Sequence, residues 1–188
     1  MNIVLTGYRC TGKTSTGRRL SARLGRPLFD TDDLVLHRTG HTVEEIVAAG
    51  GWPAFRDAER AVIRNISLLD GGIIATGGGA LLDPRNVDCL RGNGLFVWLM
   101  ADAATIAGRL AKDQANGKQR PSLSGKPVVE EVQEVLTQRE PIYQGIADLS
   151  IDTVCRGVED VATLICRHMP SQSPRAFEAE RIARRKEG

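Results

Sequence analysis

The 188-residue sequence has almost no net charge, and this excludes one broad class of partner. Its formal charge at pH 7 is +2. Segment 171–188 holds five basic and three acidic residues, which accounts for the whole excess. A nucleic-acid-binding domain needs a basic face on its folded body. The body of this chain is neutral, so we expect no nucleic-acid partner.

The sequence also lacks the patterns of a metal cluster, a disulfide framework or a membrane protein. Its four cysteines form no C-x-x-C pair, and its three histidines have no ligand-like spacing. No apolar run approaches the length of a membrane span. Met1 is followed directly by a strand-like segment instead of a secretory signal. We therefore expect one soluble, cytoplasmic domain with free thiols and no membrane partner.

Residues 7–14, GYRCTGKT, match G-x-x-x-x-G-K-[ST], the phosphate-binding P-loop. Gly7 and Gly12 permit backbone angles that turn successive N–H groups into a concave nest for phosphate. Lys13 brings a cation to the β- and γ-phosphates, and the Thr14 hydroxyl can bind Mg²⁺. The pattern predicts a nucleotide-phosphate site whose candidate contacts are Gly7, Cys10, Thr11, Gly12, Lys13, Thr14 and Ser15.

Strand-like runs alternate with helical segments along the chain. The expected strands are Asn2–Leu5, Pro27–Asp30, Ile73–Thr76, Leu95–Met100 and Leu149–Asp152. The expected helices are Thr14–Leu24, Ala103–Ala111, Pro127–Tyr143 and Val158–His168. The segments between strands are long enough for crossover helices, which favours an α/β fold with a parallel sheet and helices on both faces. Such sheets bind ligands beyond the carboxyl ends of their strands.

Three acids follow the second expected strand, at such a carboxyl end. Asp30 is the best candidate for a carboxylate on the Mg²⁺ side, because the third strand ends in glycines. It could instead cap the following helix. Asp32 could accept the proton of a substrate hydroxyl as a general base, and Asp33 could exchange roles with it.

The third expected strand ends in three consecutive glycines, Gly77, Gly78 and Gly79. Such a run costs backbone entropy, and close approach of backbone N–H groups to a ligand would compensate for it. A plain turn is the alternative interpretation.

Two arginines, Arg56 and Arg139, lie in segments that could face the same cleft. Pro141 is expected to end or kink the helix that carries Arg139. Paired guanidinium groups would suit a small acidic substrate, because each can bind a carboxylate through two parallel hydrogen bonds. Each could equally be a solvated surface arginine.

The polar stretch 112–126 is too long for an ordinary connection and predicts a mobile lid. It carries Arg120, which could close on the transferring phosphate as an arginine finger.

Together these features resemble the shikimate kinase family over about residues 2–168. Asp30-Thr31-Asp32 is similar to the family's D-T-D, Phe55-Arg56 to its F-R, and Gly77-Gly78-Gly79 to its G-G-G. Arg120-Pro121 is similar to the lid R-P, and residues 139–143, REPIY, to R-x-P-x-Y. All five stand in the family order.

The resemblance implies ATP-dependent phosphorylation of the 3-hydroxyl of shikimate, in aromatic amino-acid biosynthesis. Lys13, Asp32 and Arg120 would be catalytic. Thr14 and Asp30 would hold Mg²⁺. The substrate would be bound by Asp32, Arg56, Gly77, Gly78, Gly79 and Arg139.

The resemblance also implies that Arg109 and Arg156 flank the adenine. The implied fold is a three-layer P-loop kinase with a five-stranded parallel sheet of order 2-3-1-4-5, in a domain spanning 1–170. Segment 171–188 is expected to be a charged tail that could be disordered. The protein is expected to be a monomer.

Two alternatives come from different functional classes. One is a gluconate-type sugar-acid kinase, which shares the P-loop architecture but not the D-T-D and G-G-G pairing. The other is a non-catalytic ATP-binding switch, which we would expect to have lost Lys13, Asp32 or Arg120.

Overall fold

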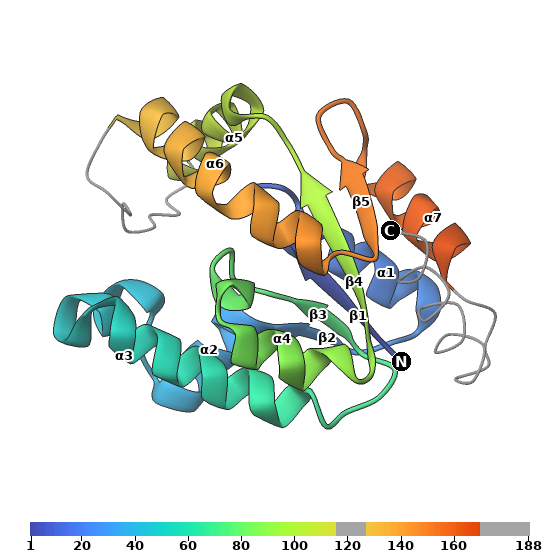
Figure 1. Cartoon of the computed structure of the whole chain (residues 1–188), viewed down its shortest axis with the longest axis horizontal. Helices are drawn as coiled ribbons and strands as arrows, with labels where there is room; N and C mark the ends of the chain where they lie inside the picture. The colour runs from blue at the N-terminus through green and yellow to red at the C-terminus, as the bar shows by residue number, and fades with distance from the viewer. Residues whose placement is uncertain (116–126, 170–188) are drawn as a thin grey trace.

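The computed structural model describes residues 1–115 and 127–169 (Figure 1). The five strands form one parallel sheet in the order β2-β3-β1-β4-β5, which confirms the expected topology. Their bounds are β1 (Asn2–Thr6), β2 (Leu28–Asp30), β3 (Ile73–Ala75), β4 (Gly94–Met100) and β5 (Leu149–Asp152). Since all strands run the same way, their carboxyl ends meet at one edge of the sheet.

Helices follow each of the strands, as parallel connections require. They are α1 (Lys13–Leu24), α2 (Thr31–Thr39), α3 (Val43–Ile66), α4 (Pro84–Arg91), α5 (Ala103–Ala115), α6 (Val128–Ile146) and α7 (Val158–His168), with a 3₁₀ turn η1 (Ala80–Leu82). The four expected helices are confirmed, α7 with the expected bounds and α1, α5 and α6 with one or both ends shifted.

The central strand β1 shows why the molecule has three layers. Every residue of β1 is buried, and neighbouring side chains point to opposite faces of the sheet. Ile3 and Leu5 pack in the cluster that includes α1 and α7, whereas Val4 packs with α3 and α4. Figure 1 shows these helix pairs on opposite faces of the sheet. The two cores therefore share one sheet.

A smaller cluster joins α5 and α6 at the end of the molecule where the strands finish (Figure 1). Asp102 caps α5, since its carboxylate accepts the Thr105 N–H at 2.6 Å. The helix was predicted to end at Ala111, before the polar stretch that begins at Lys112. Instead α5 continues to Ala115, because Ala, Lys and Gln are good helix formers. The rest of the predicted lid and the tail 171–188 lie outside the described residues.

Pro141 does not end its helix, which was one of the two outcomes expected for it. Helix α6 continues past it to Ile146. In α3, Gly51 breaks the helix with φ 71° and ψ −180°, so Arg56 lies near the start of the segment that follows the break. Within the described residues, no helix is long and apolar enough to cross a membrane.

Two glycines inside helices should respond oppositely to substitution. A Cβ at Gly17 would lie 2.8 Å from Leu28 Cδ1, where α1 packs on the sheet, whereas Gly108 on α5 has open space. We expect Gly17→Val to lower the free energy of unfolding by about 1–3 kcal/mol through overpacking. Gly108→Ala should raise it by about 0.5–1 kcal/mol. Urea unfolding measures both; equal effects would contradict the tight packing of α1.

Candidate active site

The P-loop has the backbone conformation that the sequence predicts. Gly7 and Gly12 have φ of 132° and 95°, and Cys10, a non-glycine residue, also has a positive φ of 62°. A Cβ at Gly7 would overlap the Leu99 carbonyl oxygen of β4. Gly12 precedes α1 without a side-chain cap, so the first N–H groups of that helix are presented to a ligand.

Lys13 is buried within the P-loop. Its Nζ donates to the carbonyl oxygens of Gly7 and Tyr8, at 2.9 and 2.7 Å. The Thr11 hydroxyl also donates to the Tyr8 carbonyl, at 2.8 Å. The loop therefore holds its cation by backbone oxygens.

Asp30 caps the following helix, which was one of the two roles that the sequence left open. Its Oδ2 accepts the Thr14 hydroxyl at 2.7 Å, and its Oδ1 accepts the Asp32 N–H at 3.1 Å, which caps α2. Mg²⁺ binds one or two protein oxygens together with phosphate and water. The Thr14 hydroxyl and the Asp30 carboxylate fit that requirement. Within the described residues there is no cluster of three or more metal-binding side chains.

A cavity of about 480 Å³ lies along the P-loop. It is lined by P-loop residues, by the acids that follow β2 and by the first two glycines after β3: among others Gly12, Lys13, Thr14, Ser15, Asp30, Asp32, Asp33, Gly77 and Gly78. Both Asp32 and Asp33 reach it, so the exchange of their roles stays open. Candidate contacts for the phosphate donor and for the phosphate acceptor therefore line the same cavity.

The three glycines after β3 are required by close packing. None of them has a positive φ. A Cβ at Gly77 would lie 2.6 Å from Glu59 Oε1 and 3.0 Å from Asp32 Oδ1, and one at Gly78 would lie 3.2 Å from the Arg9 nitrogen. A Cβ at Gly79 would overlap the Arg56 guanidinium. The run also forms a turn, because the Ala80 N–H donates to the Gly77 carbonyl at 3.0 Å. It is therefore a closely packed turn, and its approach to a ligand stays a prediction.

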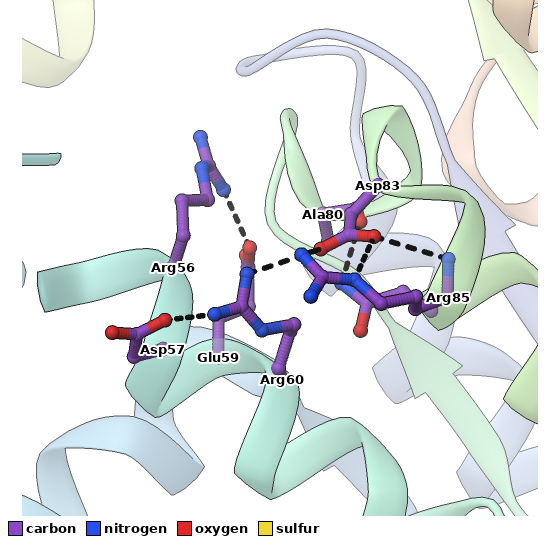
Figure 2. A network of polar contacts seen from close by, with 8 residues as sticks. Arg56, Asp57, Glu59, Arg60, Ala80, Asp83 and Arg85 are labelled. Carbon is purple, nitrogen blue, oxygen red and sulfur yellow. Dashed lines mark hydrogen bonds and ion pairs between the residues drawn. The ribbon is translucent and has the colours of Figure 1, made fainter. Parts of the chain in front are cut away.

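Arg56 is held by Glu59, three residues further along α3 (Figure 2). Its Nη1 donates to Glu59 Oε2 at 2.5 Å, and its guanidinium lies over the Phe55 and Trp52 rings. Glu59 is fully buried, and its Oε1 has no hydrogen-bond partner within the described residues. Burial raises the pKa of Glu59 to about 7 against the opposing effect of Arg56.

A second ion pair ties the same helix to the segment after the glycines. Arg60 donates to Asp83 at 3.2 Å, and Asp83 also accepts Arg85 side-chain and backbone donors at the start of α4 (Figure 2). These bonds, with the Arg85 side-chain bond the largest cause, lower the pKa of Asp83 to about 2. Asn86 donates to the Ala80 carbonyl at 2.8 Å. The glycine run is thus anchored beside Arg56.

Arg139 approaches the glycine run from α6. Its Nη1 donates to the Gly78 carbonyl at 3.2 Å, and its guanidinium lies 5.8 Å from the centroid of the Tyr8 ring. Three of the candidate substrate residues do not line the cavity: Arg56, Gly79 and Arg139. Arg139 contacts Gly78, which lines it, and Arg56 contacts the neighbouring Gly79.

The candidate adenine-side arginines lie elsewhere. Arg109 donates to the carbonyl oxygens of Cys10 and Thr153, at 3.1 and 2.7 Å, and so braces the P-loop. Arg156 is exposed and donates to the Asp152 carbonyl at 2.8 Å, away from the cavity. Arg120 lies outside the described residues.

Several groups near the site were not predicted from the sequence. Glu59 could have been predicted from its i, i+3 spacing to Arg56. The ion pair between Arg9 and Glu131 joins distant segments and has no local signal. Tyr143 belongs to the motif of residues 139–143, but its hydrogen bond to Gly78 could not be predicted from that motif.

A parallel sheet whose first strand ends in a P-loop, with carboxylates and arginines around the same cavity, defines a P-loop small-molecule kinase. The family model for shikimate kinase matches residues 9–170. The chain belongs to the shikimate kinase family, as its motifs suggested.

Individual relatives agree with this assignment. The chain is 44% identical to the shikimate kinase of Syntrophus aciditrophicus strain SB, over 91% of this chain and 92% of that one. It is 39% identical to shikimate kinase 2 of Dickeya chrysanthemi, over 89% and 93%. A solved structure of shikimate kinase from Acinetobacter baumannii, in complex with shikimate, matches with a TM-score of 0.81 and 30% identity over 88% and 90% of the two chains.

The raised pKa of Glu59 makes stability depend on pH. A carboxyl with a folded-state pKa near 7 and an ordinary value of 4.5 binds its proton more tightly in the folded state. Its contribution is fully present below about pH 4.5 and is lost as the pH rises through about 7. The wild type should lose on the order of 2–3 kcal/mol of unfolding free energy between pH 5 and pH 8 from this group.

The Glu59→Gln variant should not show that loss, because it has no proton to release. Urea unfolding of both proteins across this pH range measures the difference. Glu130→Gln makes the same change at an exposed position of α6 and should leave the slope unchanged. Parallel curves for wild type and Glu59→Gln would contradict the assignment.

Proposed function

We propose that this chain transfers the γ-phosphoryl group of ATP to the 3-hydroxyl of shikimate, giving shikimate 3-phosphate and ADP on the way to chorismate and the aromatic amino acids. The supporting observation is that one cavity is lined by the P-loop and by Asp32, Gly77 and Gly78, in a chain of this family. We further propose a monomeric, cytoplasmic enzyme; the neutral charge of residues 1–170 supports the absence of a nucleic-acid partner.

The donor half is the P-loop. Its N–H groups and the start of α1 would bind the ATP phosphates. Lys13 would exchange its backbone carbonyl partners for phosphate oxygens and stabilise their developing charge. Gly7, Cys10, Thr11, Gly12 and Ser15 complete the proposed loop contacts.

Thr14 and Asp30 would hold Mg²⁺ at this site, since they place a hydroxyl and a carboxylate oxygen together. When bound, Mg²⁺ neutralises charge on the phosphate oxygens during transfer.

The acceptor half supplies a base and a carboxylate site. Asp32 would accept the proton of the 3-hydroxyl as the oxygen attacks the γ-phosphorus and the bond to ADP breaks. Arg56 and Arg139 would bind the shikimate carboxylate, with Gly77, Gly78 and Gly79 contacting the substrate through their backbone.

Three arginines complete the proposed contacts, and those of Arg109 and Arg156 rest on resemblance alone. Arg120 would stabilise the transferring phosphoryl from the lid, and Arg156 would contact the nucleotide. Arg109 would also approach the adenine, while it braces Cys10.

The proposed function is tested by coupled ADP release with Mg²⁺ and ATP. We expect turnover that depends on shikimate and is at least about a hundredfold weaker with gluconate in kcat/KM. Gluconate is a flexible open chain, so presenting a hydroxyl to Asp32 and its carboxylate to the arginines at once costs conformational entropy that the rigid ring of shikimate does not lose. Turnover with gluconate alone would support the sugar-acid kinase alternative. ATP binding without turnover of either acid would support the non-catalytic switch.

The base is tested by Asp32→Asn. We expect kcat to fall by about 10²–10⁴-fold while the KM for ATP stays within about threefold, since an amide cannot take up the proton. Asp33→Asn is the matched control on the next residue, and it should change kcat little. A larger loss in the control would exchange the two roles, and an equal loss of ATP affinity would place Asp32 in the metal site.

A further inference from the structure

Tyr143 has no role in the site described above, yet its hydroxyl reaches the glycine run. The side chain is fully buried near the end of α6, and its ring lies 6.0 Å from that of Trp98. The O–H donates to the Gly78 carbonyl. A phenylalanine would fill the same space with no polar group to satisfy, so this bond is the feature that distinguishes tyrosine here.

The Gly78 carbonyl has two donors from the same helix. Arg139 donates to it from one turn before Tyr143. A peptide unit is planar and trans, so its C=O and N–H point in opposite directions. Fixing the Gly78 carbonyl on α6 therefore turns the Gly79 N–H away from α6. Gly79 itself lies against the Arg56 guanidinium.

The second donor matters when Arg139 binds a ligand. A carboxylate engages a guanidinium through two parallel hydrogen bonds, and where one of them takes the Nη1 donor it draws Arg139 from Gly78. The half-buried Gly78 carbonyl would then lose a hydrogen bond. Tyr143 stays bonded to this carbonyl and limits that loss. The loop has little freedom to adapt otherwise, because Gly78 also packs against the P-loop backbone at Arg9.

We propose that Tyr143 is a positioning residue of the acceptor site: its hydroxyl holds the Gly78 peptide in place so that Arg139 is released to the substrate carboxylate. This inference rests on the proposed function, in which Arg139 binds shikimate. Its consequence is specific. The hydroxyl should matter for an acceptor that carries a carboxylate, and not for ATP.

The test compares Tyr143→Phe with wild type, using shikimate and its methyl ester, which lacks the carboxylate charge. Binding is followed by the fluorescence of Trp52 and Trp98, which lie beside Arg56 and Tyr143. We expect about tenfold weaker binding and a similarly raised KM for shikimate, with kcat and the KM for ATP within about twofold. Binding of the ester should change by less than about twofold, because it leaves Arg139 on Gly78.

Thr137→Val is the matched control, since it removes an exposed hydroxyl-to-carbonyl bond from the same helix and should change none of these constants. An equal loss for shikimate and the ester, or a loss shared with ATP, would show a merely structural role and overturn the proposal. Wild-type activity distinguishes the proposed function from the proposed role of Tyr143. If the wild type did not turn over shikimate, the proposed function would be refuted, whatever the Tyr143→Phe variant showed.

One measurement needs no variant. In wild type, the proton NMR signal of the Tyr143 hydroxyl should persist on adding shikimate, while the Arg139 side-chain N–H signals shift. Loss of the hydroxyl signal with shikimate bound would overturn the proposal even if Tyr143→Phe failed to fold.

Discussion

The close backbone approach at Gly77, Gly78 and Gly79 is the constraint on which the site depends. At successive positions this run lies against the Glu59 and Asp32 carboxylates, the P-loop backbone and the Arg56 guanidinium. A Cβ would be crowded at each position, most of all at Gly77 beside the buried Glu59 carboxylate, and none of the glycines needs an unusual φ. Close packing therefore favours glycine along this run. The distance between the proposed donor and acceptor groups depends on this packing, and in-line transfer depends on that distance.

Much of the fold could be predicted because its signals are local. Apolar runs predicted the five strands, and the P-loop motif predicted where the first strand ends. Parallel sheets bind ligands at the carboxyl ends of their strands, and this rule predicted Asp30, Asp32 and the glycines as site residues. The structure places Asp30, Asp32, Gly77 and Gly78 around one cavity, whereas Gly79 packs against Arg56. The ends of α5 and α6 were less predictable, because Lys112 is a good helix former and because α6 continues past Pro141 although proline usually ends or kinks a helix.

The rest of the site could not be predicted, because its contacts join segments far apart in the sequence. Tyr143 and Gly78 are 65 residues apart, and Arg9 and Glu131 are 122 apart. A sequence pattern gives no distance between such groups. It also gives no burial, and burial is what raises the pKa of Glu59. Residue types could therefore nominate Arg56 and Arg139, but only the packing of α3 and α6 shows what holds them.

Each cation at the centre of the site has an internal partner of its own. Lys13 is held by the Gly7 and Tyr8 carbonyls, Arg56 by Glu59 and Arg139 by Gly78. Two of these three cations are held by neutral carbonyls, whose hydrogen bonds are weaker than those of phosphate or carboxylate oxygens. An anionic ligand would thus replace weak carbonyl acceptors with stronger phosphate or carboxylate oxygens. Lys13 and Arg139 are already held close to the proposed ligand positions. Arg56 differs, because its partner is itself a carboxylate that burial disfavours as an ion. A substrate carboxylate at Arg56 would therefore add to Glu59 and share its guanidinium.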